Sequence, residues 1–293
     1  MNKVRKFFVG VVTFCSIVLI LSFGVIVLSI INVPRIVPNK KLKKSLGHIS
    51  NRIGSKIVEI ITASLQILHG LEWQFDIPEH LNTRTWYVAM SNHQSWADIF
   101  ILLVAAHKRI PLLKFFMKKE LAWIPFVFLA NKTLNMPFVN RHSKKQLEKN
   151  PNLRFKDYEN TLLACKRFLR SPSTIFSYAE GTRNNSTKHK AQNSPYKNLL
   201  IPRVGGIATA LSAMPNIDVL VDYSVVYKSD KRGAWAFLKG DMRDVKVSVK
   251  KYNIPEDLKN KNYSTDEEYR KNFKIWIEGI WEEKDKEIER LKF

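Results

Sequence analysis

Residues 85–106 read TWYVAMSNHQSWADIFILLVAA, and their pattern decides the fold class. Thr85–Met90 is rich in residues that favour strands, which predicts a strand. Ile99–Ala106 is apolar and typical of a helix. The polar residues 91–98, SNHQSWAD, connect the two. A strand that enters a polar loop and continues as a helix indicates an α/β domain, in which chemistry lies where strands end.

The rest of the chain repeats this alternation of strands and helices. Apolar and tyrosine side chains alternate over 219–227, as in a half-buried strand, and valines do so over 245–249. Ser264 precedes Glu267 by three positions, a capping box that predicts a helix running to about Leu291. The other expected elements are strands at Met136–Val139 and Thr174–Ala179 and an amphipathic helix at Arg154–Arg170. We therefore expect a mixed sheet flanked by helices, preceded by an N-terminal membrane helix or helical hairpin.

The composition is that of a globular protein with a strong excess of positive charge. The chain has 293 residues, with 48 Lys and Arg against 26 Asp and Glu, and a formal charge of +22. Such an excess favours an acidic partner. Cys15 lies in an apolar run and Cys165 on the predicted amphipathic helix, so we expect no disulfide framework and a reduced, cytosolic working part. Without HExxH or paired Cys/His ligands, no metal site is expected.

A long apolar segment near the N-terminus predicts a membrane helix. Residues 7–33 contain no charged side chain. As a helix they would be about 40 Å long, more than the roughly 30 Å of hydrocarbon in a bilayer. A signal peptide has a shorter apolar region and a small-residue cleavage site, which this segment lacks. We expect a helix that is retained in the membrane.

The arrangement of this segment in the membrane stays open. Basic residues flank it at Lys3–Lys6 and at 35–44, and the positive-inside rule places both flanks in the cytoplasm. A second apolar stretch, residues 57–68, is too short to span a bilayer. The two stretches form a hairpin in one leaflet, or the first spans once with its more basic side inside. Residues 57–68 also fit a core helix of the globular domain.

Three polar motifs follow predicted strands, and their order carries a resemblance. They are NHQSWAD at 92–98, MPFVNR at 136–141 and AEGTR at 179–183. Together they resemble the lysophospholipid acyltransferase family, which includes the 1-acyl-glycerol-3-phosphate acyltransferases and shows NHxxxxD, a segment ending in arginine, and EGTR. KKELAWIP at 118–125 and NLLIPRVGG at 198–206 resemble further segments of that family. The resemblance covers roughly residues 70–230.

Two departures from the family pattern bear on the acceptor. The family's second motif reads near GxxFIDR, whereas here no glycine is present and Asn140 precedes Arg141. The loop at 184–198 lacks the common Ser-x-x-Gly. Together with LLIPR at 199–203, these features resemble the branch that acts on larger lysophospholipids, such as the lysocardiolipin-type acyltransferases. The acceptor therefore stays open between lysophosphatidic acid and a larger lysophospholipid.

His93 and Asp98 are the candidate catalytic pair. Acyl transfer from a thioester to a hydroxyl needs a base, and histidine is a residue type suited to that role. Asp98 can accept the other imidazole N–H and fix the tautomer. Five positions lie about 140° apart on a helix, so His93 belongs in the loop and Asp98 in the first helical turn. Ser95 and Asp98 also form a capping box, so Asp98 as a mere cap is one alternative and Ser95 as nucleophile is another.

The resemblance places a second group of residues at the acceptor. Arginine forks match two phosphate oxygens, and glycine permits close backbone approach. The alternative for the charged members is a surface ion pair. Glu180 would bind an acceptor hydroxyl or hold a nearby basic side chain. The expected acceptor-binding residues are Arg141, Glu180, Gly181, Thr182 and Arg183.

The resemblance implies a membrane-bound O-acyltransferase that uses no cofactor. It moves a fatty acyl group from acyl-CoA or acyl carrier protein to the glycerol hydroxyl of lysophosphatidic acid, giving phosphatidic acid; the alternative acceptors are lysophosphatidylglycerol and lysocardiolipin. Residues 1–70 would anchor the chain in a phospholipid membrane, the cytoplasmic membrane in a bacterium, and residues 71–293 would form the acyltransferase domain on the cytoplasmic side. No nucleic acid is expected as a partner. The alternative from another class is a membrane-tethered basic binding protein without catalysis.

Overall fold

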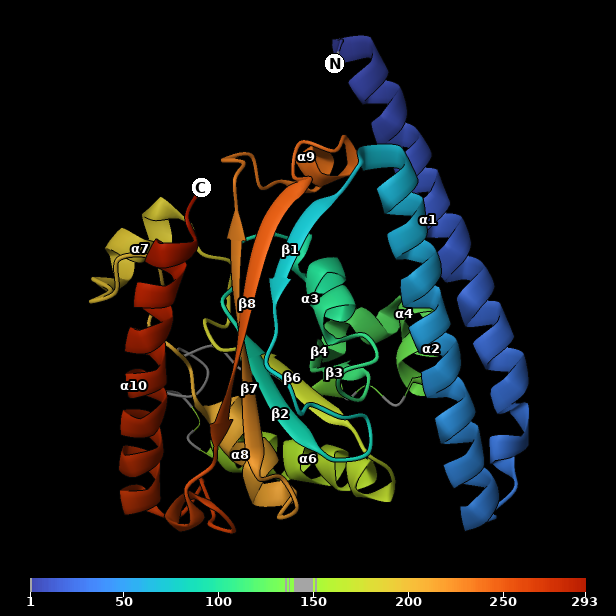
Figure 1. Cartoon of the computed structure of the whole chain (residues 1–293). Coiled ribbons are helices and arrows are strands. Elements are labelled where there is room, and N and C mark those ends of the chain that lie inside the picture. Colours follow the sequence, from blue (N-terminus) through green and yellow to red (C-terminus); the bar gives the residue numbers. More distant parts are fainter. Residues whose placement is uncertain (1, 135, 137, 140–149, 151) are drawn as a thin grey trace.

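A twisted sheet with helices on both faces forms the body of the molecule (Figure 1). The structure, a computed structural model, describes residues 2–134, 136, 138–139, 150 and 152–293. The main sheet has six strands in the order β1-β8-β7-β2-β6-β3, and β4 and β5 pair separately. The strands are β1 (Glu72–Asp76), β2 (Tyr87–Ser91), β3 (Leu113–Phe115), β4 (Met117–Lys118), β5 (Phe138–Val139), β6 (Thr174–Tyr178), β7 (Val219–Tyr227) and β8 (Asp244–Asn253). This confirms the expected mixed sheet flanked by helices.

The topology brings the polar loops together. β7, β2, β6 and β3 are parallel, whereas β8 runs antiparallel to β7 and parallel to β1. In the register of β2, Ser91 lies opposite Tyr178 on β6 and Tyr223 on β7. Carboxyl ends of neighbouring parallel strands meet at one edge of a sheet. The loop after β2 and the loop after β6 therefore lie side by side.

Two hydrophobic cores lie on the two faces of the sheet. One core contains α6, α8 and α10, and the other contains α3, α9 and part of α2. The helices are α1 (Lys3–Asn32), α2 (Lys40–His69), α3 (Asp98–Ala106), α4 (Pro125–Thr133), α6 (Asn152–Lys166), α7 (Ser186–Gln192), α8 (Gly205–Ala213), α9 (Ala234–Leu238) and α10 (Glu267–Leu291). Cys165 of α6 is fully buried, and burial raises the pKa of its thiol to about 12, so it packs as expected.

Two expectations from the sequence need correction. β7 has the expected bounds, but it is buried on both faces instead of one: Leu220 faces one core and Val221 the other. A central strand between two helical layers has no solvent face. α10 begins at Glu267, two positions later than a capping box with Ser264 as the cap predicts, and its cap is Asp266, whose side chain accepts the Tyr269 N–H at 2.8 Å.

The N-terminal segment forms an antiparallel helical hairpin beside the sheet (Figure 1). One helix, Lys3–Ile36, is long and apolar enough to cross a membrane, and only 22% of its most apolar window is buried. Residues 57–68 form the end of α2, where Ile61 and Leu65 are buried in the second core, as in a core helix. Ile67 on the same stretch is 83% exposed. The hairpin thus joins the globular core along one face of α2 and leaves most of α1 uncovered.

Candidate active site

The loop that follows β2 is fixed to the neighbouring strand by a side chain. The Asn92 amide donates to the Val225 carbonyl at 2.9 Å, and its oxygen accepts the Val225 N–H at 2.9 Å. Asn92 thereby continues the pairing of β2 with β7 beyond the last backbone pair. This double contact sets the direction in which His93 leaves the sheet.

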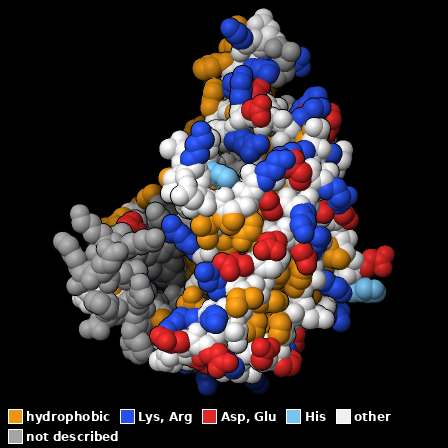
Figure 2. Space-filling model, turned by 90° about the vertical axis from the view of Figure 1, so that its left-hand side faces the viewer, with side chains coloured by type: hydrophobic (Ala, Val, Ile, Leu, Met, Phe, Trp, Pro, Cys, Tyr) orange, Lys and Arg blue, Asp and Glu red, His pale blue; other side chains and the backbone are white. Residues whose placement is uncertain are grey.

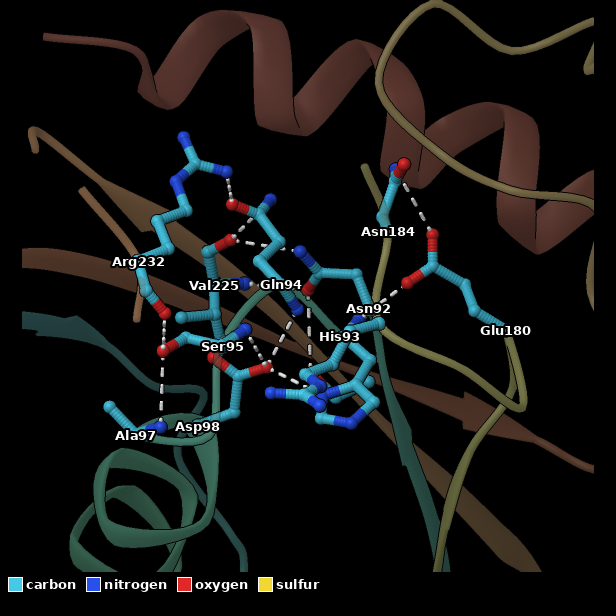
Figure 3. Close-up of polar contacts among 12 residues, drawn as sticks. Asn92, His93, Gln94, Ser95, Ala97, Asp98, Glu180, Asn184, Val225 and Arg232 are labelled. Atoms are coloured by element: carbon cyan, nitrogen blue, oxygen red, sulfur yellow. Dashed lines mark hydrogen bonds and ion pairs between the residues drawn. The ribbon is translucent and has the colours of Figure 1, made fainter. Parts of the chain in front are cut away.

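His93 and Asp98 lie in direct contact (Figure 3). His93 Nδ1 is 2.8 Å from Asp98 Oδ2. Because a carboxylate only accepts, Nδ1 carries a proton, and in the neutral imidazole Nε2 then has a free lone pair. The same Oδ2 accepts the N–H groups of Gln94 at 2.7 Å and Ser95 at 3.0 Å, and Tyr227 donates its hydroxyl to Oδ1. Asp98 is fully buried.

Asp98 therefore makes the contacts of both alternatives that the sequence offered, one with the His93 imidazole and one with the backbone at the start of α3. It is the first residue of α3, and its bond to the Ser95 N–H is half of the predicted capping box. The other half is absent, because the Ser95 hydroxyl accepts from the Ala97 N–H at 3.2 Å and donates to the Arg232 carbonyl at 2.8 Å. Ser95 is fully buried, so it is in no position to act as a nucleophile.

The His93 ring lies flat against Tyr178. The ring centroids are 3.9 Å apart and the planes differ by 16°. The His93 side chain is 19% exposed, and within the described part of the chain nothing hydrogen-bonds to Nε2. Burial raises the pKa of Tyr178 well above its usual value, so this ring stays neutral. The contact leaves one nitrogen of a fixed imidazole accessible to a substrate.

Glu180 supports the His93 loop from behind. Its Oε2 accepts the His93 N–H at 2.6 Å, and its Oε1 accepts from the Asn184 amide at 3.4 Å (Figure 3). Oε1 also accepts the Leu200 N–H at 2.8 Å. The side chain is fully buried, and burial raises its pKa to about 7 although both N–H groups oppose this. The expected contact of Glu180 with the acceptor is therefore not available here, because its oxygens are used by backbone donors.

The rest of the AEGTR motif forms a tight turn after β6. Gly181 has a φ of +67°, which favours glycine, and a Cβ there would lie 2.9 Å from Cδ of the flexible Arg203 side chain. Thr182 accepts from the Lys188 ammonium at 2.7 Å. The Arg183 carbonyl accepts from the Lys188 ammonium at 3.1 Å. The Arg183 side chain is exposed, and its guanidinium has no partner among the residues that the structure describes, so it is open to a ligand. Arg141 lies outside the described residues.

Several residues of the site were not predicted from the sequence. Tyr178 and Tyr227 end their strands, and nothing in the local pattern separates them from core residues. Asn92 belongs to the NHQSWAD motif, but the motif did not show that its side chain pairs with β7. A buried ion pair also lies close by: the Lys284 ammonium of α10 is 2.9 Å from Asp222 of β7. In the described ranges, no three His, Cys, Asp or Glu side chains are grouped so that they could hold a metal ion.

Comparison with known proteins agrees with this geometry. A curated relative from Saccharomyces cerevisiae, named 2-acyl-1-lysophosphatidylinositol acyltransferase, is 24% identical over 231 residues. The match covers 70% of this chain and 57% of the yeast protein, so the chain spans little more than half of its relative's length.

A solved structure shares the fold along the whole chain. The crystal structure of the 1-acyl-sn-glycerophosphate (LPA) acyltransferase PlsC from Thermotoga maritima is similar with a TM-score of 0.60 at 14% identity, over 100% of this chain and 99% of the other. The family model described as Acyltransferase matches residues 72–228, more than half of the chain, from β1 to the end of β7. This span contains the His93–Asp98 pair and the AEGTR turn. The chain therefore belongs to the acyltransferase family.

Proposed function

We propose that the protein transfers a fatty acyl group from a thioester donor to the glycerol hydroxyl of a lysophospholipid. The observation that carries this proposal is the His93 imidazole, held by Asp98 at 2.8 Å with its second nitrogen unoccupied. Family membership and the two relatives support acyl transfer to a lysophospholipid acceptor.

The geometry supports a direct transfer. His93 Nε2 takes the proton of the acceptor hydroxyl while the oxygen attacks the thioester carbonyl carbon. A carbon–oxygen bond forms, the carbon–sulfur bond breaks, and the leaving thiolate takes the proton back from His93. Asp98 stabilises the imidazolium between these steps. Because Ser95 is buried, no covalent acyl-enzyme is part of the scheme.

Lysophosphatidic acid is the first candidate for the acceptor, with phosphatidic acid as the product. Arg183, exposed beside the His93 loop, and Arg141 would hold the phosphate, since guanidinium forks bind two oxygens. A larger lysophospholipid, such as lysophosphatidylglycerol or lysocardiolipin, is the second candidate. The name of the yeast relative, whose acceptor carries a bulky inositol headgroup, favours this second candidate.

The apolar helix supports action at a membrane. α1 exposes Phe7, Leu19 and Phe23 by more than half, and lipid would cover such side chains. We propose that the hairpin anchors the chain in the membrane with the catalytic domain on the cytoplasmic side. Labelling of a Lys3→Cys variant from either side of sealed membranes distinguishes a hairpin from a single span.

Product analysis tests the reaction and the acceptor together. Purified protein is incubated with acyl-CoA or acyl carrier protein and each lysophospholipid, and the new phospholipids are identified by mass spectrometry. We expect His93→Ala to abolish product formation while its melting temperature stays within a few degrees of wild type, because the ring is at the surface of the core. A fully active His93→Ala protein would refute the proposed enzyme mechanism.

A further inference from the structure

A cavity of about 560 Å³ lies between α7, the end of β7 and the last turn of α10. Its volume is in the range of small-molecule sites, which is roughly 300–1,000 Å³. Gln94, Tyr227 and Asn184 form its inner wall, and Lys190, Lys228 and Arg232 are part of the rest. We call this space the α7–α10 cavity.

The inner wall of the α7–α10 cavity is the back of the His93 loop. Gln94 follows His93 in the chain, and the Asn184 N–H donates to the His93 carbonyl at 2.7 Å. Tyr227 donates to Asp98. His93 itself does not line the cavity. A ligand in this space would thus be adjacent to the catalytic loop but would not present its own reacting atom to His93.

The cavity carries positive charge that the protein does not neutralise. Five of the residues that line it are Lys or Arg, and one is an aspartate. Lys197 and Lys292 both pair with Glu289, at 2.8 and 2.7 Å. Lys190 and Lys228 have no carboxylate partner within the described part of the chain, and Arg232 donates to Gln94. Figure 2, which shows the face with α7 and α10, has Lys and Arg side chains gathered over its upper part. Such a cavity favours an anionic ligand.

The two substrates differ in where their phosphates lie. In a lysophospholipid the phosphate is a few atoms from the reacting hydroxyl, so it must bind close to His93. In acyl-CoA the phosphates and the adenosine are separated from the thioester by the pantetheine arm. A cationic cavity of nucleotide size that adjoins the His93 loop without including His93 matches the second arrangement.

We propose that the α7–α10 cavity binds the phosphorylated adenosine end of an acyl-CoA donor. Lys190 and Lys228 neutralise its phosphates, and Arg232 offers a guanidinium fork beside Gln94. The pantetheine arm then leads around Gln94 towards His93. This inference rests on the proposed function, since it names the donor of that reaction.

Matched charge variants test the proposal. The variant Lys190→Gln/Lys228→Gln removes two cationic side chains that contact no part of the catalytic loop. The control Lys251→Gln/Lys271→Gln removes two exposed lysines that do not line the cavity, so the total charge is the same. We expect the KM for acyl-CoA to rise by about 5- to 20-fold in the cavity variant and to change by less than about twofold in the control. The KM for the acceptor should change by less than about twofold in both variants. Equal donor KM values in the two variants would overturn the proposal.

A nucleotide probe separates this inference from the proposed function. Adenosine 3′,5′-bisphosphate carries the phosphates without the thioester, and its binding is measured by calorimetry on the full chain. We expect it to bind wild type and the control, to bind the cavity variant more weakly, and to compete with acyl-CoA. An enzyme that forms phospholipid only with acyl carrier protein and does not bind the probe would refute the nucleotide site and leave the reaction intact. A protein that forms no phospholipid with any donor would refute the proposed function, and probe binding alone would then decide whether this cavity holds a nucleotide.

Discussion

Replacing Glu180 by glutamine tests whether this carboxylate acts by positioning His93. Its two oxygens accept the backbone N–H groups of His93 at 2.6 Å and Leu200 at 2.8 Å. Glutamine keeps one acceptor oxygen, and its NH₂ group must face the other N–H. Above about pH 7, where Glu180 is ionised, one charge-assisted hydrogen bond is lost, which is worth about 1.5–3 kcal/mol. If the His93 N–H loses its partner, a shift of the loop by about 1 Å would lower the rate roughly 100-fold.

The assay compares kcat at saturating substrate with the melting temperature of the same preparation. We expect Glu180→Gln to lose most of its kcat and to keep its acceptor KM, since Glu180 is fully buried and does not reach the acceptor. Glu268→Gln, an exposed change in the first turn of α10, is the control and should have wild-type values of both. A raised acceptor KM with an unchanged kcat would refute the positioning role and restore direct contact with the acceptor.

The same variant also has a pH signature. Burial raises the pKa of Glu180 from 4.5 to about 7, so the folded protein favours its protonated form. Below pH 4.5 the Glu180 side chain is protonated in both the folded and the unfolded chain. Between pH 4.5 and about 7 the unfolded chain loses this proton while the folded chain keeps it, so the free energy of unfolding decreases as the pH rises. The cost is on the order of 3 kcal/mol. The melting temperature of wild type minus that of Glu180→Gln should therefore decrease from pH 5 to pH 8. A difference that grows over this range would contradict the raised pKa.

Three further changes have expected outcomes. Lys284→Met should lower the free energy of unfolding by about 3–5 kcal/mol, because it leaves Asp222 buried without its partner. The control Lys286→Met, at an exposed position, should change it by less than about 0.5 kcal/mol. Equal free energies of unfolding for the two variants, measured with denaturant, would contradict this prediction. Gly181→Ala should destabilise the fold by about 1–2 kcal/mol through its positive φ alone, and an unchanged melting temperature would show that the turn relaxes. Tyr227→Phe removes the hydroxyl donor to Asp98 and should lower kcat by about tenfold with little change in either KM.

The capping box at Ser95–Asp98 shows how far local sequence reasoning extends. The spacing placed Asp98 correctly at the start of a helix and His93 in the preceding loop. It left capping and catalysis as alternatives, because sequence spacing does not show how many donors a carboxylate meets. In the fold, Oδ2 accepts from His93, Gln94 and Ser95 while Oδ1 accepts from Tyr227. One carboxylate has enough lone pairs to accept from the imidazole and from the loop backbone at the same time.

The sequence by itself determined the elements and the order of the motifs. Alternation and helical periodicity depend on neighbouring residues, so the bounds of β7 and the end of α10 at Leu291 followed directly. What only the tertiary structure decided is which residues meet. Glu180 lies 87 positions from His93 and binds its backbone because β2 and β6 are adjacent parallel strands whose loops leave the same edge. Burial also depends on how the layers pack. The sequence pattern of β7 predicts one face in solvent, but helices cover both faces of this strand. The loss of water around Glu180 raises its pKa to about 7. Contacts and burial of this kind depend on strand order, which no local pattern contains.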